Sequence, residues 1–378
     1  CDKWYDRQPP ATDAIDLPPC PRFIRADFPQ LLPNFRMDSS CNPNRLDYCN
    51  RFHRGAHACY KSSMLDESAQ QCCYNKKGEL LVGSPGGGTL KLKNPDVAPI
   101  EYWANDVKPF YMCCLLNKEK NKAKTSSQKY YDARPCDDGR NWTPPAIGGG
   151  SGDPHFFTLD GLMYTFNGLG EYVLLEVRGG DGQLTIQVRM LPIGGGGGDE
   201  QFGTVFKAIA VKYENDVIQA ELDEDGDVVV YLNGTLFELD DETTLTDSLS
   251  VGELIFLRSS SNSYMIECPN QVSVEIDDSQ DGDALTFILH VPSSLKGLTR
   301  GLLGFMDGDT SNDFMLPNGT ILYIDEGNDR EIFETFGPHW RANNLNGSIF
   351  FYHNNNNNNY STVNYENFVP KFISDEIV

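Results

Sequence analysis

Three consecutive residues, Asp153, Pro154 and His155, have the types and spacing for chemistry on their own backbone. The Asp153 carboxylate can attack its own main-chain carbonyl to form a five-membered anhydride, and the proline nitrogen leaves readily once it is protonated. A neighbouring imidazole can supply that proton, because histidine occupies both protonation states near neutral pH. On these residues alone the simpler alternative stays open, namely that Asp-Pro only turns the chain into a strand.

A second candidate is the acidic run from residue 307 to residue 313. Carboxylate and amide oxygens are the ligands that calcium prefers, and backbone carbonyls can complete six to eight of them. The run is not an EF-hand, because its sixth position is not glycine and its twelfth is not glutamate. A calcium-binding loop and a solvated acidic turn therefore both remain open. The oxygen-bearing acid and amide side chains are those of Asp307, Asp309, Asn312 and Asp313.

Cysteine usage separates the first part of the chain from the rest. Ten of the 11 cysteines precede residue 137 and form no CxxC pair, which indicates disulfides made in an oxidising compartment rather than zinc ligands. We expect these ten to pair among themselves and Cys268 to stay a buried thiol. The ten are Cys1, Cys20, Cys41, Cys49, Cys59, Cys72, Cys73, Cys113, Cys114 and Cys136.

Charge and glycosylation signals agree with an extracellular protein. Residues 151–378 hold 10 of the 31 basic residues and 37 of the 54 acidic ones, a balance of −27. This acidity argues against nucleic acid or anionic membranes as partners of the second half. The sequence contains no run of 18 apolar residues, which is about the length that a membrane-spanning helix needs. Five N-glycosylation sequons agree with secretion, at Asn141, Asn233, Asn318, Asn346 and Asn359.

Period-two alternation of apolar residues predicts a mainly β protein with an antiparallel, sandwich-like second domain. Runs such as Leu184–Leu191, Val217–Leu222 and Leu285–Val291 are separated by Asp-Gly and Asn-Gly turns. The expected layout has four parts. They are an irregular disulfide-rich module (1–146), a glycine-rich linker (147–152), the β domain (153–340), and an asparagine-rich insert with a connector to further extracellular domains (341–378).

Several motifs resemble those of known extracellular domains. The first module, with Gln70-Gln71-Cys72-Cys73-Tyr74 and Tyr111-Met112-Cys113-Cys114, is similar to an AMOP domain. The β domain resembles a von Willebrand factor type D domain, and an AMOP domain directly followed by a D domain is the arrangement of a small group of surface proteins. The D-domain motifs are residues 152–155, 164–168, 301–304 and 336–340.

The resemblance implies more than the residues alone. It implies self-cleavage between Asp153 and Pro154, carried out by these two residues and His155. It also implies a structural calcium ion held by Asp160, Asp307, Asp309, Asn312 and Asp313. Two departures matter: Phe305 stands where a family ligand is usually Asn, and Leu303 stands where secreted mucins carry a cysteine, which argues against their covalent multimers.

We therefore expect a non-enzymatic adhesion or cell-junction segment of a larger single-pass membrane protein, whose only chemistry is self-cleavage. Its expected partners are other cell-surface or matrix proteins, with homophilic pairing as one option. A mucin-like, gel-forming matrix protein is the alternative, and intermolecular bonding through Cys268 would distinguish it. A secreted hydrolase is a third option, which the lack of GxSxG and paired-carboxylate motifs disfavours.

Overall fold

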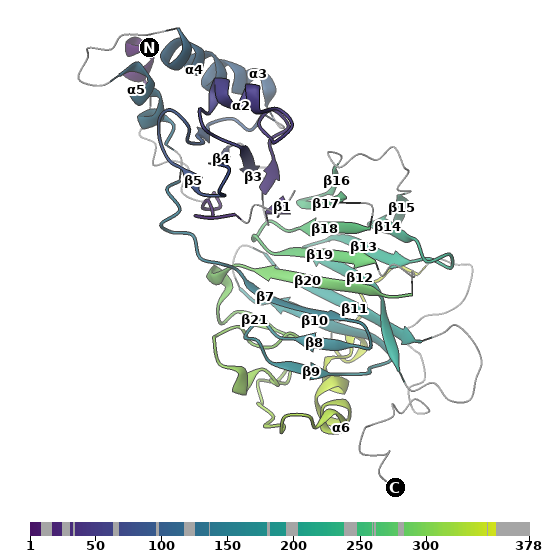
Figure 1. Ribbon diagram of the computed structural model, residues 1–378. Coiled ribbons are helices and arrows are strands. Elements are labelled where there is room, and N and C mark those ends of the chain that lie inside the picture. Colours follow the sequence, from purple (N-terminus) through teal and green to yellow (C-terminus); the bar gives the residue numbers. More distant parts are fainter. Residues whose placement is uncertain are drawn as a thin grey trace. The chain divides into compact units, whose positions relative to one another are not determined.

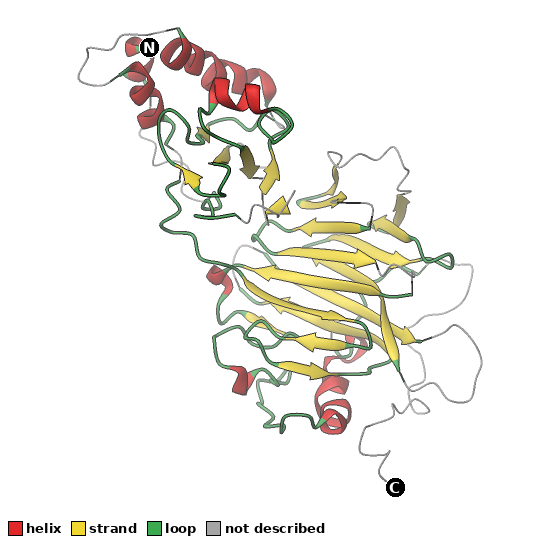
Figure 2. Cartoon of the chain, in the orientation of Figure 1, coloured by secondary structure: helices red, strands yellow, loops and turns green. Residues whose placement is uncertain are grey.

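The chain divides into two compact units, residues 1–144 and 145–378 (Figure 1). The computed structural model describes residues 1–8, 17–24, 31–32, 35–62, 68–95, 98–116, 125–135, 137–179, 182–193, 203–237, 248–258, 260, 262–278, 283–345 and 347–352. The mainly β fold class predicted from the sequence is confirmed, and Figure 2 shows that the second unit is built largely of strands.

The first unit combines an antiparallel sheet with short helices. The sheet has the order β1-β2-β3-β4-β5, and β6 pairs with β4. This is more regular structure than the loop-rich sequence suggested. The elements are α1 (Asp2–Tyr5), β1 (Leu31–Leu32), β2 (Phe35–Met37), α2 (Leu46–Phe52), β3 (Ala58–Ser62), β4 (Ala69–Tyr74), β5 (Leu80–Leu81), β6 (Leu90–Lys91), α3 (Pro99–Tyr102), η2 (Trp103–Val107), α4 (Lys108–Phe110), η3 (Tyr111–Leu115) and α5 (Ser126–Ala133).

The segment from α3 to η3 is one continuous helical stretch with a proline at its start and another inside it. Pro99 occupies the first turn of α3, where its missing N–H would have no helical partner anyway. Pro109 lies inside the stretch, where it removes a backbone hydrogen bond, and π-helical turns flank it on both sides (η2 and η3). The stretch therefore stays helical, with π-helical turns on either side of the proline.

Four disulfides hold the first unit together: Cys1–Cys113, Cys20–Cys72, Cys41–Cys49 and Cys59–Cys73. The expectation that all ten cysteines pair is wrong at Cys114, which is a free thiol. It follows Cys113 in the π-helical turn η3; Cys113 pairs with Cys1, and the Cys114 thiol hydrogen-bonds Ser127. Cys136 lies outside the described residues. In the second unit Cys268 is a buried free thiol, as the sequence predicted.

The second unit is a sandwich of two antiparallel sheets (Figure 1). One sheet has the order β15-β14-β13-β12-β11-β10-β21 and the other β16-β17-β18-β19-β20-β7-β8-β9. The strands are β7 (Ala146–Ser151), β8 (His155–Phe157), β9 (Met163–Thr165), β10 (Gly170–Val177), β11 (Leu184–Pro192), β12 (Thr204–Tyr213), β13 (Asp216–Leu222), β14 (Val228–Leu232), β15 (Thr235–Phe237), β16 (Ser248–Val251), β17 (Leu254–Arg258), β18 (Ser263–Glu267), β19 (Ser273–Asp278), β20 (Leu285–Val291) and β21 (Thr299–Arg300). Short helices follow them: η4 (Ser293–Leu295), η5 (Thr310–Asn312), α6 (Asp329–Glu331), η6 (Ile332–Phe336), η7 (Gly337–Trp340) and η8 (Ala342–Asn344).

Aromatic side chains join the two sheets at the centre of the core. Phe206 on β12 packs edge-to-face against Phe156 on β8, with ring centroids 5.3 Å apart, and against Phe287 on β20 at 4.7 Å. All three side chains are buried. Edge-to-face aromatic pairs add to the free energy gained from burying apolar area. The alternating apolar positions of the sequence thus face one shared core.

Residues 147–152, expected to be a linker, mostly belong to strand β7. It lies between β20 and β8 in the larger sheet, with Gly149 opposite Ile288 and Phe157. Glycine occupies this strand because neighbouring groups already fill the space that a side chain would need. A Cβ on Gly150 would lie 2.8 Å from the Phe206 ring. The linker prediction was wrong because glycine composition suggests flexibility wherever packing is unknown.

Alanine at Gly149 is expected to lower the free energy of unfolding of the second unit by about 1–3 kcal/mol, the usual cost of overpacking. Its Cβ would lie 2.3 Å from the backbone oxygen of Phe287. Chemical denaturation followed by intrinsic fluorescence measures the change, and Ser151→Ala, at an exposed position of the same strand, is the matched control. Equal stability of the two variants would contradict this packing explanation.

The second unit also extends beyond its expected boundary at residue 340. Residues 347–352 form a strap that packs on the outer face of the smaller sheet. Gln187 and Gln219 on that face hydrogen-bond the strap backbone, and the Arg189 guanidinium lies 4.4 Å from the Phe350 ring centroid. The strap therefore covers polar side chains that a lone sheet would leave in water. The asparagine run and the proposed connector lie outside the described residues.

Candidate functional site

The β7–β8 hairpin holds the Asp153–Pro154 bond in its turn. Ser151 pairs with His155 across the hairpin, so residues 152–154 connect the two strands. Gly152 has a φ of 63°, a left-handed conformation that glycine adopts without the strain of a Cβ. The bond that the sequence singled out is therefore held between paired strands rather than in a flexible linker.

The two residues of this bond have different environments. The Asp153 side chain is exposed and lies beside Gly203. Pro154 is buried, and its carbonyl oxygen accepts a hydrogen bond from the Phe166 backbone N–H at 3.1 Å. The carboxylate is thus open to water, while the proline ring and the strand that follows are held in place.

His155 contacts groups that the sequence reasoning missed. Its Nδ1 lies 3.0 Å from the hydroxyl of Thr165, its cross-strand partner on β9. Asp329, the first residue of α6, lies close enough for the charge of His155 to act on it. Burial raises the pKa of the Asp329 carboxyl, while a backbone hydrogen bond from Thr165 and the nearby His155 act in the opposite direction. The imidazole is thus oriented by a hydroxyl and faces a carboxylate.

The acidic loop contacts the turn of the β8–β9 hairpin, a proximity that the resemblance implied. The Asp160 carboxylate, in the turn between β8 and β9, accepts backbone N–H bonds from Asp307, Gly308 and Asp309 at 2.9, 2.8 and 3.2 Å. Three donors on one oxygen make a strong, charge-assisted anchor. The structure therefore brings Asp160 to a loop far along the sequence from it.

Asp313 is the buried carboxylate of this loop. Its oxygens accept hydrogen bonds from the Thr158 hydroxyl at 2.6 Å and the Phe305 backbone N–H at 3.1 Å. Burial raises the pKa of Asp313 to about 7, and the neighbouring carboxylates of Asp160 and Asp307 add to the increase. A bound cation would offset the repulsion between these neighbouring carboxylates and so stabilise the loop.

The loop residues fit a calcium ion in their chemistry. Asn312 donates through Nδ2 to Asp307 at 2.9 Å, whereas its Oδ1 is buried and has no hydrogen-bond partner in the described residues. That oxygen and the carboxylates form an all-oxygen donor set, which suits a hard cation. Phe305 contributes a backbone N–H to the site, and its side chain offers no oxygen to replace the usual Asn.

Among the described residues, one other group brings potential metal-ligating atoms close together. The ligand atoms of His53, Cys59 and Cys73 lie within 4.8 Å of one another. However, Cys59 and Cys73 form a disulfide, so neither sulfur is the thiolate that a metal requires. The carboxylates of the acidic loop are more widely spaced than this, and several of their oxygens already accept N–H groups.

The sequons differ in accessibility. Asn141 and Asn318 are exposed. Asn233 lies in the β14–β15 turn with a φ of 48°, where its Nδ2 donates to Asp216 and its Oδ1 accepts from Val217 N. A glycan on that amide would compete with a hydrogen bond that shapes the turn, so glycosylation there is less favoured than at the first two. Asn346 and Asn359 lie outside the described residues.

Two family models match the chain in succession: the AMOP domain over residues 1–143 and the von Willebrand factor type D domain over residues 149–320. The chain is an AMOP domain followed by a von Willebrand factor type D domain. The type D match includes the β7–β8 hairpin, Asp160 and the acidic loop. The AMOP match covers the four disulfides.

Individual relatives align with a large part of this chain. Human sushi domain-containing protein 2 is 30% identical over 91% of the chain, and the Bombyx mori protein mesh is 26% identical over 90%. Human mucin-4 is 29% identical over 64%. The matched region is 42%, 23% and 4% of these relatives' lengths, so the chain corresponds to a part of each.

The AMOP–type D chain is extracellular. Its disulfides require an oxidising compartment, and its relatives include a mucin. Among the described residues, no helix combines the length and apolar character that crossing a bilayer demands.

Proposed function

We propose that this chain is an adhesion segment, acting at cell–cell or cell–matrix contacts as part of a larger single-pass membrane protein. The succession of AMOP and type D domains carries the proposal, because it is the arrangement found in sushi domain-containing protein 2 and protein mesh. Its partners would be other surface or matrix proteins, including a second copy of the chain. Its chemistry would be confined to its own backbone, with no turnover of a substrate.

An aggregation assay tests the adhesion role. The full chain, displayed on cells that do not adhere, is expected to make them cluster with one another or with cells carrying a partner. Cells displaying an unrelated disulfide-rich domain on the same anchor are the control. Dispersed cells in both homotypic and mixed cultures, despite normal surface display, would count against adhesion.

The mucin-like alternative has less support. Gel formers of this family assemble through intermolecular disulfides. Cys268 is only 2% exposed and Leu303, where a cysteine would stand, is fully buried, so among the described residues only the partly exposed Cys114 offers a thiol for such a bond. A gel run with and without reductant distinguishes the two roles. A ladder of reducible multimers would favour the matrix protein over the adhesion segment.

The proposed self-cleavage balances without any external reagent except water. The Asp153 carboxylate oxygen would bond to its own main-chain carbonyl carbon, and the bond to the Pro154 nitrogen would break as that nitrogen takes a proton. His155 would supply the proton, oriented by Thr165 and Asp329. Water would then open the anhydride and regenerate the Asp153 carboxyl together with a new α-carboxyl. The hairpin supports this step by restricting the backbone on both sides of the bond.

We also propose that Asp160, Asp307, Asp309, Asn312 and Asp313 hold a calcium ion. The gathered carboxylates and the buried Asn312 oxygen support it. Calcium would neutralise like charges and tie the β8–β9 hairpin to the acidic loop, in a part of the chain with a large negative balance.

Calcium is expected to raise the melting temperature of the type D domain relative to the same protein in EDTA. At a hundredfold excess over Kd, the added free energy of unfolding is about 2.7 kcal/mol. Asn312→Ala should shrink this calcium-dependent shift, because it removes a proposed ligand oxygen. Tyr323→Ala, at a position that is 81% exposed, is the control. Identical melting curves in calcium and EDTA would rule the site out.

A further inference from the structure

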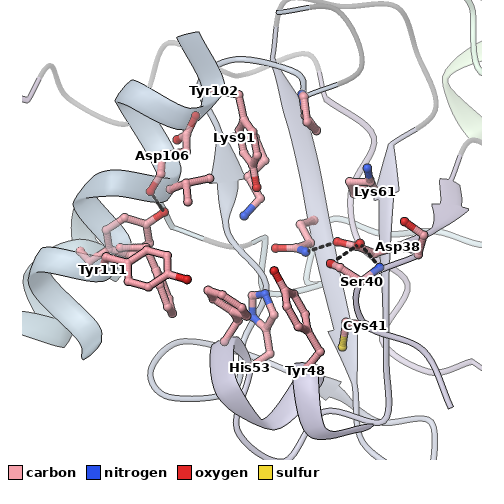
Figure 3. A pocket seen from close by; sticks show the side chains of 17 residues that line it. Asp38, Ser40, Cys41, Tyr48, His53, Lys61, Lys91, Tyr102, Asp106 and Tyr111 are labelled. Carbon is pink, nitrogen blue, oxygen red and sulfur yellow. Dashed lines mark hydrogen bonds between the residues drawn. The ribbon is translucent and has the colours of Figure 1, made fainter. Parts of the chain in front are cut away.

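The AMOP domain contains a cavity of about 320 Å³ between α2, the strands β4 and β6, and the helical stretch from α3 to η3 (Figure 3). Its charged groups interact with one another. Burial would raise the pKa of the Asp38 carboxyl, but the nearby charges of Lys61 and Lys91 and hydrogen bonds from Ser40 hold it below its usual value. Burial lowers the pKa of His53 to about 4, so this ring is neutral at pH 7. Two lysines and two carboxylates line the cavity, so its charge balances and selects no ligand.

The type D domain has a different kind of site, on the face of the smaller sheet that the strap covers. One row of cross-strand neighbours runs through Glu171 on β10, Arg189 on β11, Ala208 on β12 and Glu221 on β13. Residues directly opposite each other in antiparallel strands share one face of the sheet. The row therefore places a small alanine between long, charged side chains.

A second row repeats this arrangement two residues along the strands. Gln187 on β11 and Gln219 on β13 both pair with Ala210 on β12, and residues two positions apart on a strand point to the same face. Both glutamines are buried. The strap residue Phe350 packs against Ala208 and Ala210 and is buried with them. The two alanines thus leave space above β12, and Phe350 fills it.

The two glutamines hold the backbone of the strap. Gln187 donates through Nε2 to the Gly347 carbonyl oxygen and accepts through Oε1 from the Ile349 N–H, both at 3.0 Å. Gln219 accepts from the Phe351 N–H at 2.8 Å and donates to the Phe351 carbonyl oxygen at 3.4 Å. Side-chain amides thus take the place that a neighbouring strand's backbone has in a sheet, at alternate residues of the strap. Main-chain contacts of this kind supply affinity for a peptide segment.

The charged row contacts the side chains of the strap. The Arg189 guanidinium lies 4.4 Å from the Phe350 ring centroid and 5.5 Å from that of Tyr352. It also pairs with Glu171 at 3.0 Å and with Glu221 at 2.9 Å. The Tyr352 hydroxyl donates to Glu171 at 2.7 Å. The site therefore selects a peptide with aromatic side chains at two alternate positions, the second of them with a hydroxyl group.

The strap lies outside the main core. Its apolar side chains form a small cluster with Ala208 and Ala210, distinct from the core between the two sheets. Withdrawal of the strap would therefore leave that core closed and would expose a face made mostly of polar side chains. Arg189 would keep both of its carboxylate partners, because they belong to the sheet itself. The face is thus a peptide site that the chain fills with its own segment.

We propose that this face binds residues 347–352 of a second copy of the chain, so that two copies pair by exchanging straps. The incoming strap is identical to the outgoing one, so every contact described above is kept. Exchange of an identical element is a low-cost route to a dimer. The chain's own strap is tethered beside the site, which gives it an effective concentration on the order of millimolar. Exchange is therefore expected where many copies are crowded together, as at a contact between two cells.

Strap exchange would serve the homophilic option of the proposed adhesion role, on which it rests. Exchange is measured between isolated chains in solution, whereas adhesion is measured between cells. Chains that exchange straps while cells remain dispersed would contradict the adhesion role alone. Cells that cluster while isolated chains do not exchange would contradict only the exchange.

Two complementary variants of the full chain test exchange by light scattering. Phe350→Ala weakens the strap and leaves the site intact, whereas Ala208→Leu fills the space for Phe350 and leaves the strap intact. Each variant alone is expected to be monomeric at micromolar concentration. Their equimolar mixture is expected to form 1:1 dimers, because the intact strap of one chain meets the open site of the other.

Leu236→Ala supplies the matched control, because Leu236 is 47% exposed on β15 of the same sheet and does not contact the strap in the cluster around Phe350. Mixed with Phe350→Ala in place of Ala208→Leu, it should give at least about tenfold less dimer, since its strap stays tethered at its own site. Gln219→Ala and Tyr352→Ala remove polar contacts rather than packing. They replace Ala208→Leu and Phe350→Ala respectively if thermal melts show that either is unfolded.

A synthetic peptide of residues 347–352 gives a second measurement. In calorimetric titrations it should bind the Phe350→Ala chain, and it should bind the Ala208→Leu chain at least roughly tenfold more weakly, the effect of losing one packed aromatic contact. The same peptide carrying Phe350→Ala is the control and should not bind. An excess of the unsubstituted peptide should also dissociate the mixed dimer.

A mixed dimer that the peptide dissociates would support strap exchange. A mixture of folded variants that stays monomeric would overturn it. Peptide binding without dimers would also overturn it and would reassign the face to a segment of another protein. Equal amounts of dimer in the test and control mixtures would overturn it as well, because the contact between copies would then lie elsewhere.

Discussion

Asp153→Ala is expected to leave the chain whole under conditions in which the unsubstituted chain separates into two pieces, one ending at Asp153 and one beginning at Pro154. The variant lacks the carboxylate that forms the anhydride, so the reaction has no nucleophile. The effect should be all-or-none, because an alanine methyl cannot replace the attacking oxygen. Asp153→Asn is a second test, since an amide of similar size is a far weaker nucleophile.

The proton donor should affect the rate rather than the occurrence of cleavage. His155→Ala is expected to slow the reaction by about 10²–10⁴-fold, the usual contribution of a general acid. Thr165→Val and Asp329→Asn should slow it less, because these residues orient the imidazole and do not touch the bond. The rate should rise as the pH falls from 8 to 5.5, because the departing nitrogen must take up a proton. The increase should be lost in His155→Ala.

The two pieces are expected to stay together after cleavage. Strand β7 would end the first piece, yet it is paired with β20 on one side and with β8 on the other, and both of those belong to the second piece. Among the described residues, no disulfide joins the two units. The cleaved chain should therefore run as one species in native size-exclusion chromatography and as two on a denaturing gel without reductant.

N-terminal sequencing of protein held at pH 5.5 and pH 8 with protease inhibitors measures the reaction. A new terminus at Pro154 in the unsubstituted chain, absent from Asp153→Ala, is the expected result. An intact chain at both pH values would exclude self-processing. Cleavage that persists in Asp153→Ala would assign the cut to a contaminating protease.

Reduction is expected to unfold the AMOP domain while the type D domain keeps its structure. The four disulfides span 112, 52, 8 and 14 residues of sequence, and each typically contributes about 2–4 kcal/mol. The apolar clusters of this domain are small, and each includes at least one bridged cysteine among its buried members. The type D domain has one large aromatic and aliphatic core and a single free, buried cysteine among its described residues.

Hydrogen exchange before and after treatment with reductant measures this difference domain by domain. Amides of β3 and β4 should lose protection, whereas those of β11 and β12 should keep it. Cys268→Ser is the control without reductant, and it should leave the AMOP domain folded. Equal loss of protection in both domains, or retention in both, would contradict the assignment of stability to the disulfides.

The local features of this fold were readable from residue types. The alternation that predicted a strand over Leu184–Leu191 is confirmed by β11, and the run Val217–Leu222 lies within β13. Strands with one apolar face show this alternation of apolar and polar residues, because successive side chains point to opposite faces of the sheet. The cysteine count likewise indicated a disulfide-stabilised first domain, although it could not say which sulfurs meet.

Contacts between distant segments had no such local signal. Gly149 reads as part of a linker until Phe287 and Phe157 are seen to fill its side-chain space. Thr165 is the cross-strand neighbour of His155 only once β8 and β9 pair, and nothing near Asp329 in the sequence indicates that it interacts with that imidazole. The AMOP cavity depends in the same way on Lys91 and Tyr111 meeting across a sheet and a helix. Such pairings are set by how whole elements pack, and the free energy that selects them is spread over the core rather than encoded near either residue.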